Sequence, residues 1–433
     1  MASRHSPGPR ATLALAVLLC ALAAASFAAP RAGAATGISY GLTDDAWLAD
    51  GPGTLDDRVA RLQSIGVEVV RFTLHWNEIA PTRPSASTDP DDPAYDWSNA
   101  SPVLDALHSA GIDVLLQLLG APRWANGGKP ANYAPKSASS FAAFATAAAR
   151  EFPWVRKWLI WNEPNQALWL RPTSPSTYVS RLLNPAYAAI HREIPGAKVA
   201  GGGTAPRGSR HGVSPVAWLQ GMHRAHAHLD AYAHNPYPLN PKRESPTRGG
   251  CGHCTTITMA TLNRLEILVA RDFPHARIWL SEYGYQTNPP DKFLGVAPAR
   301  QATYQAAAAY VAYHAPRVDL LIHFLYMDEP NVARFQSGLV TVAGIPKPSL
   351  AAFELPLAQT ARTGNRASLW GELRAPAAGA TGTLERKVGR SWRRLATVHA
   401  GAGGFFRWRG TLPRHSVVRL RAGTLAGAAL VVS

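Results

Sequence analysis

Residues 157–201, KWLIWNEPNQALWLRPTSPSTYVSRLLNPAYAAIHREIPGAKVAG, contain the unit that decides the fold. The segment begins with a short apolar run at 157–161, continues into a helix-patterned stretch at 175–194 and ends in a second β-prone run at 198–201. A strand, a longer helix and another strand in this order are typical of a parallel sheet with crossover helices. The segment therefore predicts an α/β fold.

The same alternation repeats along most of the chain. We predict eight strands, at 38–41, 67–73, 113–118, 157–161, 198–201, 229–234, 277–281 and 320–324. Helix-patterned stretches between them include 54–65, 138–151, 175–194, 256–272 and 300–314. Eight βα units over roughly 320 residues have the size and count of a (β/α)8 TIM barrel. In such barrels the chemistry lies at the carboxyl ends of the strands, so we expect functional residues in the loops that follow them.

The composition changes near the C-terminus. From Ala367, short alternating runs separated by Gly, Pro and Arg turns predict a small antiparallel, Ig-like β-sandwich; the runs lie at 369–373, 381–387, 392–398, 405–408 and 416–421. We interpret 361–366 as a short connector, because it lacks the Ser/Thr/Pro-rich composition of a free tether.

The first 34 residues have the layout of a secretory signal peptide. Arg4 and Arg10 precede the apolar run 11–25, and the small residues 32–34 offer a cleavage site. The run is too short for a spanning helix, so we expect an exported protein without a membrane span. The expected parts are a signal peptide at 1–34, a barrel domain at 35–360 and a basic β-sandwich at 361–433.

The formal net charge of +16 is concentrated at the two ends of the chain. Residues 1–34 contribute +3 and residues 362–433 contribute +11, which leaves +2 for 35–361. The basic C-terminal stretch lacks a nucleic-acid-binding motif and aromatic residues interleaved with a basic groove, so we expect no nucleic-acid partner. An anionic polymer is a candidate partner for this stretch, and a solvated, charged packing module is the alternative.

Cys251 and Cys254 are the two cysteines outside the predicted signal peptide. In an oxidising compartment they most simply form a disulfide that pins their loop. A redox-active C-x-x-C site is an alternative, but such a motif normally begins a helix after a strand, and here it follows a loop at 238–250 that is rich in Pro, Lys and Arg. A metal site is the third reading, although two thiolates and His253 do not complete a zinc shell. We expect no metal and no cofactor.

Two glutamates follow the fourth and seventh predicted strands. Glu163 lies in WNEPN at 161–165, and Glu282 lies in SEYGY at 281–285. Acids at these two strand ends face each other across a barrel axis. Cleavage of a glycosidic bond needs such a pair, one acid to protonate the leaving oxygen and one to attack the anomeric carbon or activate water. Either glutamate alone could be a salt-bridge residue at the rim, but the pair predicts a glycosidase active site.

These motifs resemble the clan A retaining glycoside hydrolases, which are TIM barrels with glutamates at the ends of strands four and seven. The resemblance covers about residues 36–357. It is carried by WNEPN at 161–165, by Glu282, by Arg71 on the second strand and by AHNPY at 233–237. The WNEPN string is most like members of family 39 or family 5.

The resemblance implies a role for each matching residue. Glu163 would be the acid/base and Glu282 the nucleophile. Asn162 would hydrogen-bond the sugar 2-hydroxyl, and Arg71 and Tyr237 would hold the nucleophile ionised and oriented. This division agrees with the chemistry, because a nucleophilic carboxylate needs a nearby cation and a proton donor needs a raised pKa.

Five further residues are expected to contact substrate. Asn235 occupies the place where the family often has a histidine two residues before the strand-six tyrosine, and His234 is displaced from it by one residue. Tyr326 follows strand eight, where the family usually has a tryptophan. Trp76, Trp124 and Tyr326 are candidate platforms for sugar rings, because flat aromatic faces match the apolar C–H faces of sugars. The alternative for each aromatic residue is packing in the core or in a loop.

The sequence thus predicts a secreted, monomeric retaining glycosidase that hydrolyses β-linked oligo- or polysaccharides. The alternative from another class is a non-catalytic carbohydrate-binding or surface-adhesion protein on the same barrel. The GISYG string at 37–41 matches a serine-hydrolase nucleophile elbow, but it begins without the full strand that such an elbow needs.

Overall fold

The computed structural model describes residues 37–252 and 254–433, so the predicted signal peptide lies outside the described residues. Gly37–Ser433 form one compact unit. Eight parallel strands close into a barrel in chain order. They are β1 Ser39–Thr43, β2 Val69–His75, β3 Asp113–Leu119, β4 Lys157–Ile160, β5 Lys198–Thr204, β6 Ala231–His234, β7 Arg277–Tyr283 and β8 Val318–Phe324. The predicted TIM barrel is confirmed.

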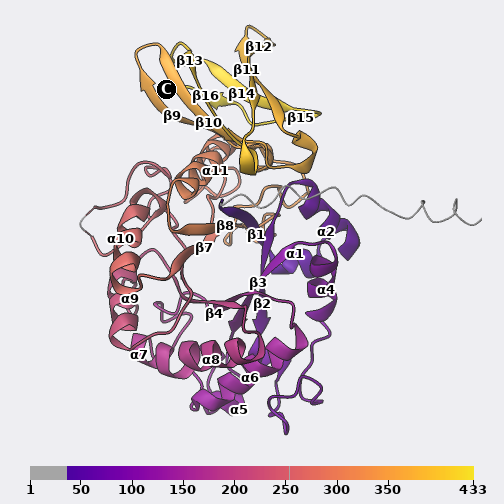
Figure 1. The fold of residues 1–433 in the computed structure, drawn as a ribbon, viewed down its shortest axis with the longest axis vertical. Helices are drawn as coiled ribbons and strands as arrows, with labels where there is room; N and C mark the ends of the chain where they lie inside the picture. Colours follow the sequence, from indigo (N-terminus) through magenta and orange to yellow (C-terminus); the bar gives the residue numbers. More distant parts are fainter. Residues whose placement is uncertain (1–36, 253) are drawn as a thin grey trace, which may run out of the picture. The chain divides into compact units, whose positions relative to one another are not determined.

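Helices surround the barrel and alternate with its strands (Figure 1). They are α1 Asp45–Asp50, α2 Leu55–Ser64, α3 Trp76–Ile79, α4 Ser101–Ser109, α5 Arg123–Asn126, α6 Ala138–Glu151, α7 Pro175–Tyr178, α8 Asn184–Glu193, α9 Pro215–Arg224, α10 Leu262–Asp272, α11 Pro298–Tyr313 and α12 Pro348–Glu354. A π-helical turn, Val179–Leu183, joins α7 to α8, and a 3-10 turn, Met259–Thr261, precedes α10. Local sequence explains the helix starts: Thr54 and Asp57 form a capping box at α2, and Ser214 caps α9.

Two apolar layers hold the barrel together. The inner layer fills the barrel with small and large side chains that fit together: Val69, Leu115, Leu159, Ala200, Ala231, Ala233, Trp279, Leu320 and Ile322. The outer layer lies between strands and helices. Gly41 shows how tight the inner packing is, since an added Cβ would lie 2.3 Å from the carbonyl oxygen of Val69. Close packing of this kind fixes the strand ends, and with them the residues that follow each strand.

The C-terminal strands form two antiparallel sheets. The first has the order β13-β10-β9, and the second contains β12, β11, β14 and β15, with β16 paired to β14. Their bounds are β9 Leu357–Thr363, β10 Arg366–Glu372, β11 Thr381–Val388, β12 Ser391–His399, β13 Phe405–Thr411, β14 Val417–Ala422, β15 Leu425–Ala426 and β16 Leu430–Val431. A separate apolar cluster, which includes Leu369, Leu384 and Leu420, forms their core. This arrangement agrees with the predicted β-sandwich; its Ig-like character stays a prediction.

The interpretation of 361–366 as a connector is wrong. Residues 361–363 complete β9 and Arg366 begins β10, so only Gly364 and Asn365 form the turn between them. Gly364 has a positive φ of 56°, a conformation that glycine adopts without strain.

Buried contacts join the C-terminal sheets to the barrel. The guanidinium of Arg374 lies 3.6 Å from the ring centroid of Tyr40 and pairs with Glu372 at 2.8 Å. Tyr313 of α11 packs against Phe405 of β13, with ring centroids 4.1 Å apart. Within the described residues, none of the helices has the length and apolar character needed to cross a membrane.

Candidate active site

Glu163 lies in a sharp turn at the carboxyl end of β4. Trp161 and Glu163 both have positive φ, at 69° and 38°, which is uncommon for residues other than glycine. The turn is held because the Glu163 amide donates to the carbonyl of Gly203 at 2.9 Å. Strained backbone of this kind persists only where the surroundings enforce it, and it clusters at functional sites. Here the turn places the carboxyl group in a cavity.

Glu282 is held through both of its carboxylate oxygens. Arg71 Nη1 donates to Oε2 at 2.9 Å and also to the carbonyl of Ser281 at 2.8 Å. The Tyr237 hydroxyl donates to Oε1 at 2.8 Å. Arg71 comes from β2, Tyr237 follows β6 and Glu282 lies near the end of β7, so residues of three strands and their loops fix the orientation of one carboxylate. The structure thus brings together the three residues that the sequence grouped.

Asn235 links Glu163 to Ser281, the residue before Glu282. Its Nδ2 donates to Glu163 Oε1 at 3.2 Å, and its Oδ1 accepts from Ser281 Oγ at 2.8 Å. The side chain is fully buried, and the serine hydroxyl fixes which end of the amide faces Glu163. Asn162, beside Glu163, is also buried. Asn235 is a predicted substrate contact, and its hydrogen bond to Glu163 is not predictable from the sequence.

The surroundings raise the pKa values of two groups in the site, Glu163 and Tyr237. Burial and, second, the negative charge of Glu282 raise the pKa of Glu163 to about 7 from its ordinary value of 4.5. The hydrogen bond from Asn235 and the charge of Arg71 act in the opposite direction. Burial and the same Glu282 charge raise the pKa of Tyr237, so its hydroxyl stays a proton donor to the carboxylate. A carboxyl group with a pKa near 7 can both give and take a proton at neutral pH.

The cavity at Glu163 has a volume of about 480 Å³. Its walls include three aromatic side chains that follow different strands: Trp169, Tyr285 and Phe335. Tyr237 and Arg207 also line it. Aromatic walls around a carboxyl group suit a ligand with both hydroxyl groups and apolar faces, as a sugar has. No group of three or more metal-ligating side chains is found in 37–252 or 254–433.

Two of the predicted platforms, Trp76 and Trp124, do not line the cavity at Glu163. Trp76 is 0% exposed and packs against Trp124 and Phe144, with ring centroids 5.5 and 5.4 Å away. A fully buried ring offers no surface to a sugar, which corrects the prediction for Trp76. Trp124 is half-buried, and its Nε1 donates to the carbonyl of Ala80 at 2.9 Å. It does not line the cavity at Glu163, and its sugar contact stays a prediction.

His234 is also a core residue, which corrects its predicted sugar contact. Tyr326 is largely buried and does not line the cavity at Glu163, and its sugar contact stays a prediction. His234 is fully buried between Thr204 and the carbonyl of Ile257, at 2.8 and 3.1 Å, and burial lowers its pKa to about 4. Tyr326 packs on Trp47 with ring centroids 4.1 Å apart, and its hydroxyl accepts a hydrogen bond from Arg61 Nε of α2 at 3.0 Å. Both side chains support the strand ends and leave the cavity to other residues.

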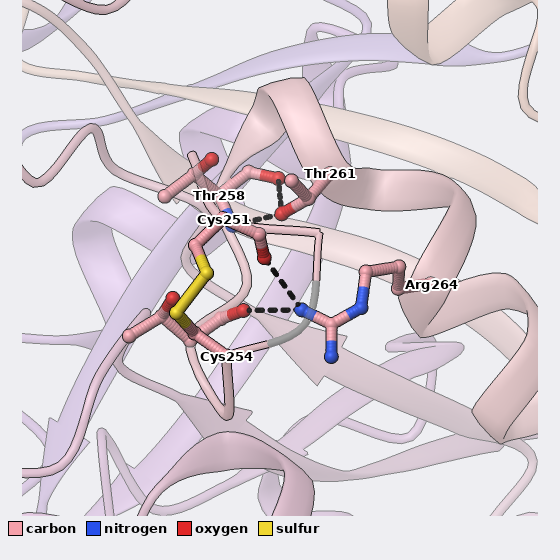
Figure 2. Close-up of a disulfide and its surroundings, with 6 residues drawn as sticks. Cys251, Cys254, Thr258, Thr261 and Arg264 are labelled. Carbon is pink, nitrogen blue, oxygen red and sulfur yellow. Dashed lines mark hydrogen bonds between the residues drawn. A yellow bond between two sulfur atoms is a disulfide. The ribbon is translucent and has the colours of Figure 1, made fainter. Parts of the chain in front are cut away.

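The predicted disulfide between Cys251 and Cys254 is confirmed. Figure 2 shows it beside Arg264, whose Nη1 donates to the carbonyls of Cys251 and Thr256 at 2.9 and 3.1 Å. Next along the chain, Met259 donates its amide to the carbonyl of Pro236, the residue before Tyr237. The disulfide therefore closes a small ring, and a few residues further along the chain the Met259 amide is hydrogen-bonded to the segment that contains Tyr237.

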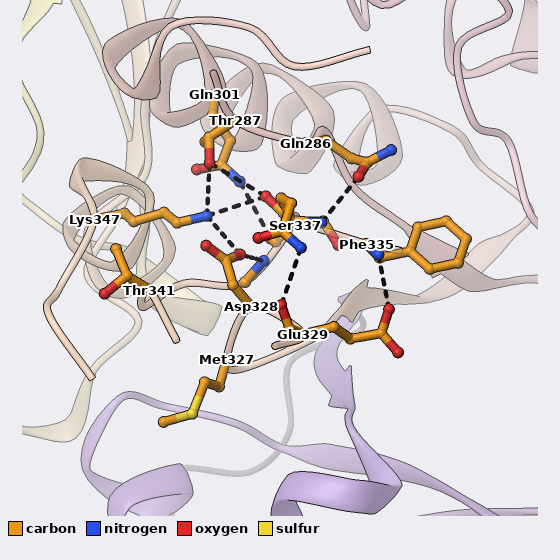
Figure 3. A network of polar contacts seen from close by, with 12 residues as sticks. Gln286, Thr287, Gln301, Met327, Asp328, Glu329, Phe335, Ser337, Thr341 and Lys347 are labelled. Carbon is orange, nitrogen blue, oxygen red and sulfur yellow. Dashed lines mark hydrogen bonds and ion pairs between the residues drawn. The ribbon is translucent and has the colours of Figure 1, made fainter. Parts of the chain in front are cut away.

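A buried ion pair supports the rim of the cavity (Figure 3). Lys347 Nζ donates to Asp328 Oδ1 at 2.7 Å and to Thr287 Oγ1 at 2.8 Å. It also donates to the carbonyl of Gln336 at 3.0 Å, next to Phe335 of the cavity wall. Lys347 and Asp328 side chains are 4% and 2% exposed. Because the ammonium links the loops after β7 and β8, it fixes the wall that these loops build.

Comparisons with known proteins identify solved structures with a similar fold. No protein-family model and no curated protein matches the sequence. Among solved structures, a bifunctional glucanase-xylanase from a metagenome library has a TM-score of 0.52 and 11% identity, over 92% of this chain and 97% of its own. The β-glycosidase of the hyperthermophile Thermosphaera aggregans has a TM-score of 0.50 and 13% identity, over 74% of this chain and 95% of its own.

A third match is longer than this chain. A calcium-binding mutant of β-glucuronidase 2 from Bacteroides uniformis has a TM-score of 0.49 and 13% identity, over 91% of this chain and 44% of its own. This chain therefore spans less than half the length of that enzyme. At 11% and 13% identity, the glucanase-xylanase and the β-glycosidase of Thermosphaera aggregans show a shared fold alone.

Proposed function

We propose that the protein is a secreted clan A retaining glycosidase, most like family 39 or family 5, that hydrolyses β-linked oligo- or polysaccharides. The observation that carries the proposal is the contrast between two carboxyl groups of one site. Glu163 has a pKa of about 7, whereas Glu282 is bound by a guanidinium and a phenol through both oxygens. Pairs of acids with such different surroundings divide the roles of acid/base and nucleophile.

In the proposed reaction, a Glu282 oxygen attacks the anomeric carbon while Glu163 gives its proton to the leaving glycosidic oxygen. The bond between the anomeric carbon and that oxygen breaks, and a glycosyl ester forms on Glu282. Glu163, now a carboxylate, takes a proton from water, and the resulting hydroxide attacks the anomeric carbon and releases Glu282. Two inversions leave the configuration unchanged.

Three features support the substrate class and the location. The aromatic walls offer flat apolar surfaces to sugar rings. Two solved structures with a shared fold are by name a glucanase-xylanase and a β-glycosidase, and the second name favours β-linked substrates. The signal-like N-terminus and the disulfide favour export to an oxidising compartment.

The test is a screen of the full mature chain against β- and α-linked polysaccharides and aryl glycosides. We expect turnover of at least one β-linked substrate, its loss in Glu282→Gln, and unchanged turnover in Glu78→Gln, an exposed acid of α3. Binding of polysaccharide without any turnover across the panel would instead support the non-catalytic alternative. Near-normal turnover in Glu282→Gln would refute the proposed nucleophile.

A further inference from the structure

A second cavity lies between α11 and the first C-terminal sheet. It has a volume of about 520 Å³ and shares no lining residue with the cavity at Glu163. Its walls include Tyr310 and His314 from the barrel side, and Ser368, Trp370, Arg407 and Arg409 from β10 and β13. Neither the sequence motifs nor the proposed reaction uses these residues.

Two arginines on β13 share one face of the sheet. Residues two apart in a strand point to the same side, and both Arg407 and Arg409 are exposed. Arg407 pairs with Trp370 across the sheet, and Arg409 pairs with Ser368. Trp370 is buried and packs toward Tyr310 of α11, with ring centroids 5.7 Å apart. Both guanidinium groups therefore belong to the face that lines the cavity.

His314 orients one of these guanidinium groups without neutralising it. Its Nδ1 lies 2.9 Å from the carbonyl oxygen of Tyr310, and a carbonyl oxygen can only accept, so Nδ1 carries the proton. Its Nε2 lies 3.0 Å from Arg407 Nη2 and accepts from it. This hydrogen bond fixes the position of the Arg407 guanidinium at the cavity wall.

The surrounding chain offers no acid to balance these charges. Residues 362–433 contain only two acids, and both are already paired: Glu372 with Arg374 at 2.8 Å, and Glu385 with Arg419 at 2.7 Å. Among the described residues, Arg407 and Arg409 form no ion pair. Two guanidinium groups that form no ion pair with the described residues, one of them oriented by His314, are suited to bind carboxylates, because the planar guanidinium matches a carboxylate with two parallel hydrogen bonds.

We propose that this cavity binds a carboxylate-bearing segment of an acidic polysaccharide. Arg407 and Arg409 bind uronate carboxylates, and the half-buried ring of Tyr310 contacts the apolar face of a sugar ring. The volume falls within the range of cavities that hold small ligands, so a short oligosaccharide segment fits. Because no lining residue is shared with the cavity at Glu163, the site holds polymer and takes no part in bond cleavage.

The test is calorimetric titration of the full mature chain with oligogalacturonate at low ionic strength. The variant Arg407→Ala/Arg409→Ala removes two charges from the cavity. Its matched control, Arg393→Ala/Arg394→Ala, removes two exposed charges from β12 in the other sheet. We expect the cavity variant to lose at least tenfold in affinity and the control to lose less than threefold. Neutral dextran should not bind at this site.

Three results would overturn the proposal. The first is an equal loss of oligogalacturonate affinity in the cavity variant and the control, which would mean diffuse attraction to a basic surface. The second is the absence of measurable oligogalacturonate binding. The third is tighter binding of a single-stranded DNA oligomer than of oligogalacturonate, which would mean a nucleic-acid surface. If the alanine variant does not fold, as judged by its thermal melt, Arg407→Lys/Arg409→Lys replaces it. That variant keeps the charge and loses the planar fork, so it should still weaken oligogalacturonate binding more than the control Arg393→Lys/Arg394→Lys does. The titration does not depend on turnover, so its outcome is separate from that of the proposed function.

Discussion

Glu163 should control the alkaline limb of the pH–activity profile. Its pKa of about 7 is some 2.5 units above the ordinary value, which corresponds to about 3 kcal/mol in favour of the protonated form. The first chemical step needs that proton. kcat/KM on a substrate with a poor leaving group should therefore fall tenfold for each pH unit above about 7. A glutamate with an ordinary pKa would begin this fall near pH 4.5.

Two variants separate the causes of the raised pKa. Glu282→Gln removes the like charge, so the Glu163 pKa should fall by on the order of one unit while burial continues to raise it. Asn235→Ala removes a hydrogen bond to the charged form, so the pKa should rise. Carbon-13 NMR titration of the labelled Glu163 carboxyl measures both changes without turnover. If the Glu163 pKa changed in the same direction in both variants, or if the alkaline limb of the pH–activity profile lay near pH 4.5, this explanation would be refuted.

Three other changes test the supports of the site. Tyr237→Phe removes the hydroxyl 2.8 Å from the candidate nucleophile and should lower kcat at least tenfold with little change in melting temperature, whereas unchanged kcat would contradict its role. Lys347→Met leaves Asp328 buried without its cation and should cost about 3–5 kcal/mol in urea unfolding; Lys347→Met/Asp328→Leu should recover most of it, and an equally unstable double variant would argue against the ion pair. Replacing Cys251 and Cys254 by serine should lower stability by about 2 kcal/mol or less, because the closed loop is short, so loss of the whole fold would show that the disulfide supports the core.

The sequence predicts the barrel and the centre of the site well for one physical reason. Strands of a barrel are short apolar runs between turns, and topology brings their carboxyl ends together. The placement of Glu163 and Glu282 therefore follows from position, whereas the contact of Arg71 with Glu282 was implied only by the family resemblance.

The surroundings of the site could not be predicted in the same way. Trp76 and Phe335 both follow barrel strands, but Trp76 turns into the helix layer and packs on Phe144, whereas Phe335 lines the cavity. The direction of a ring depends on the path of its loop, which periodicity does not encode. The link through Asn235 depends on Ser281 of another strand. β9 was missed because its sequence, LAQTART, alternates only weakly.

The most direct test of the central claim is the configuration of glycosyl azides made by two variants from an aryl β-glycoside. In Glu163→Ala, azide should replace the missing base and attack the ester on Glu282, which gives a β-glycosyl azide. In Glu282→Ala, azide should replace the missing nucleophile and attack the substrate from the opposite face, which gives an α-glycosyl azide. Proton NMR distinguishes the two products. Exchanged configurations would mean that the two roles are reversed, and absence of azide products from both variants would contradict the double-displacement mechanism.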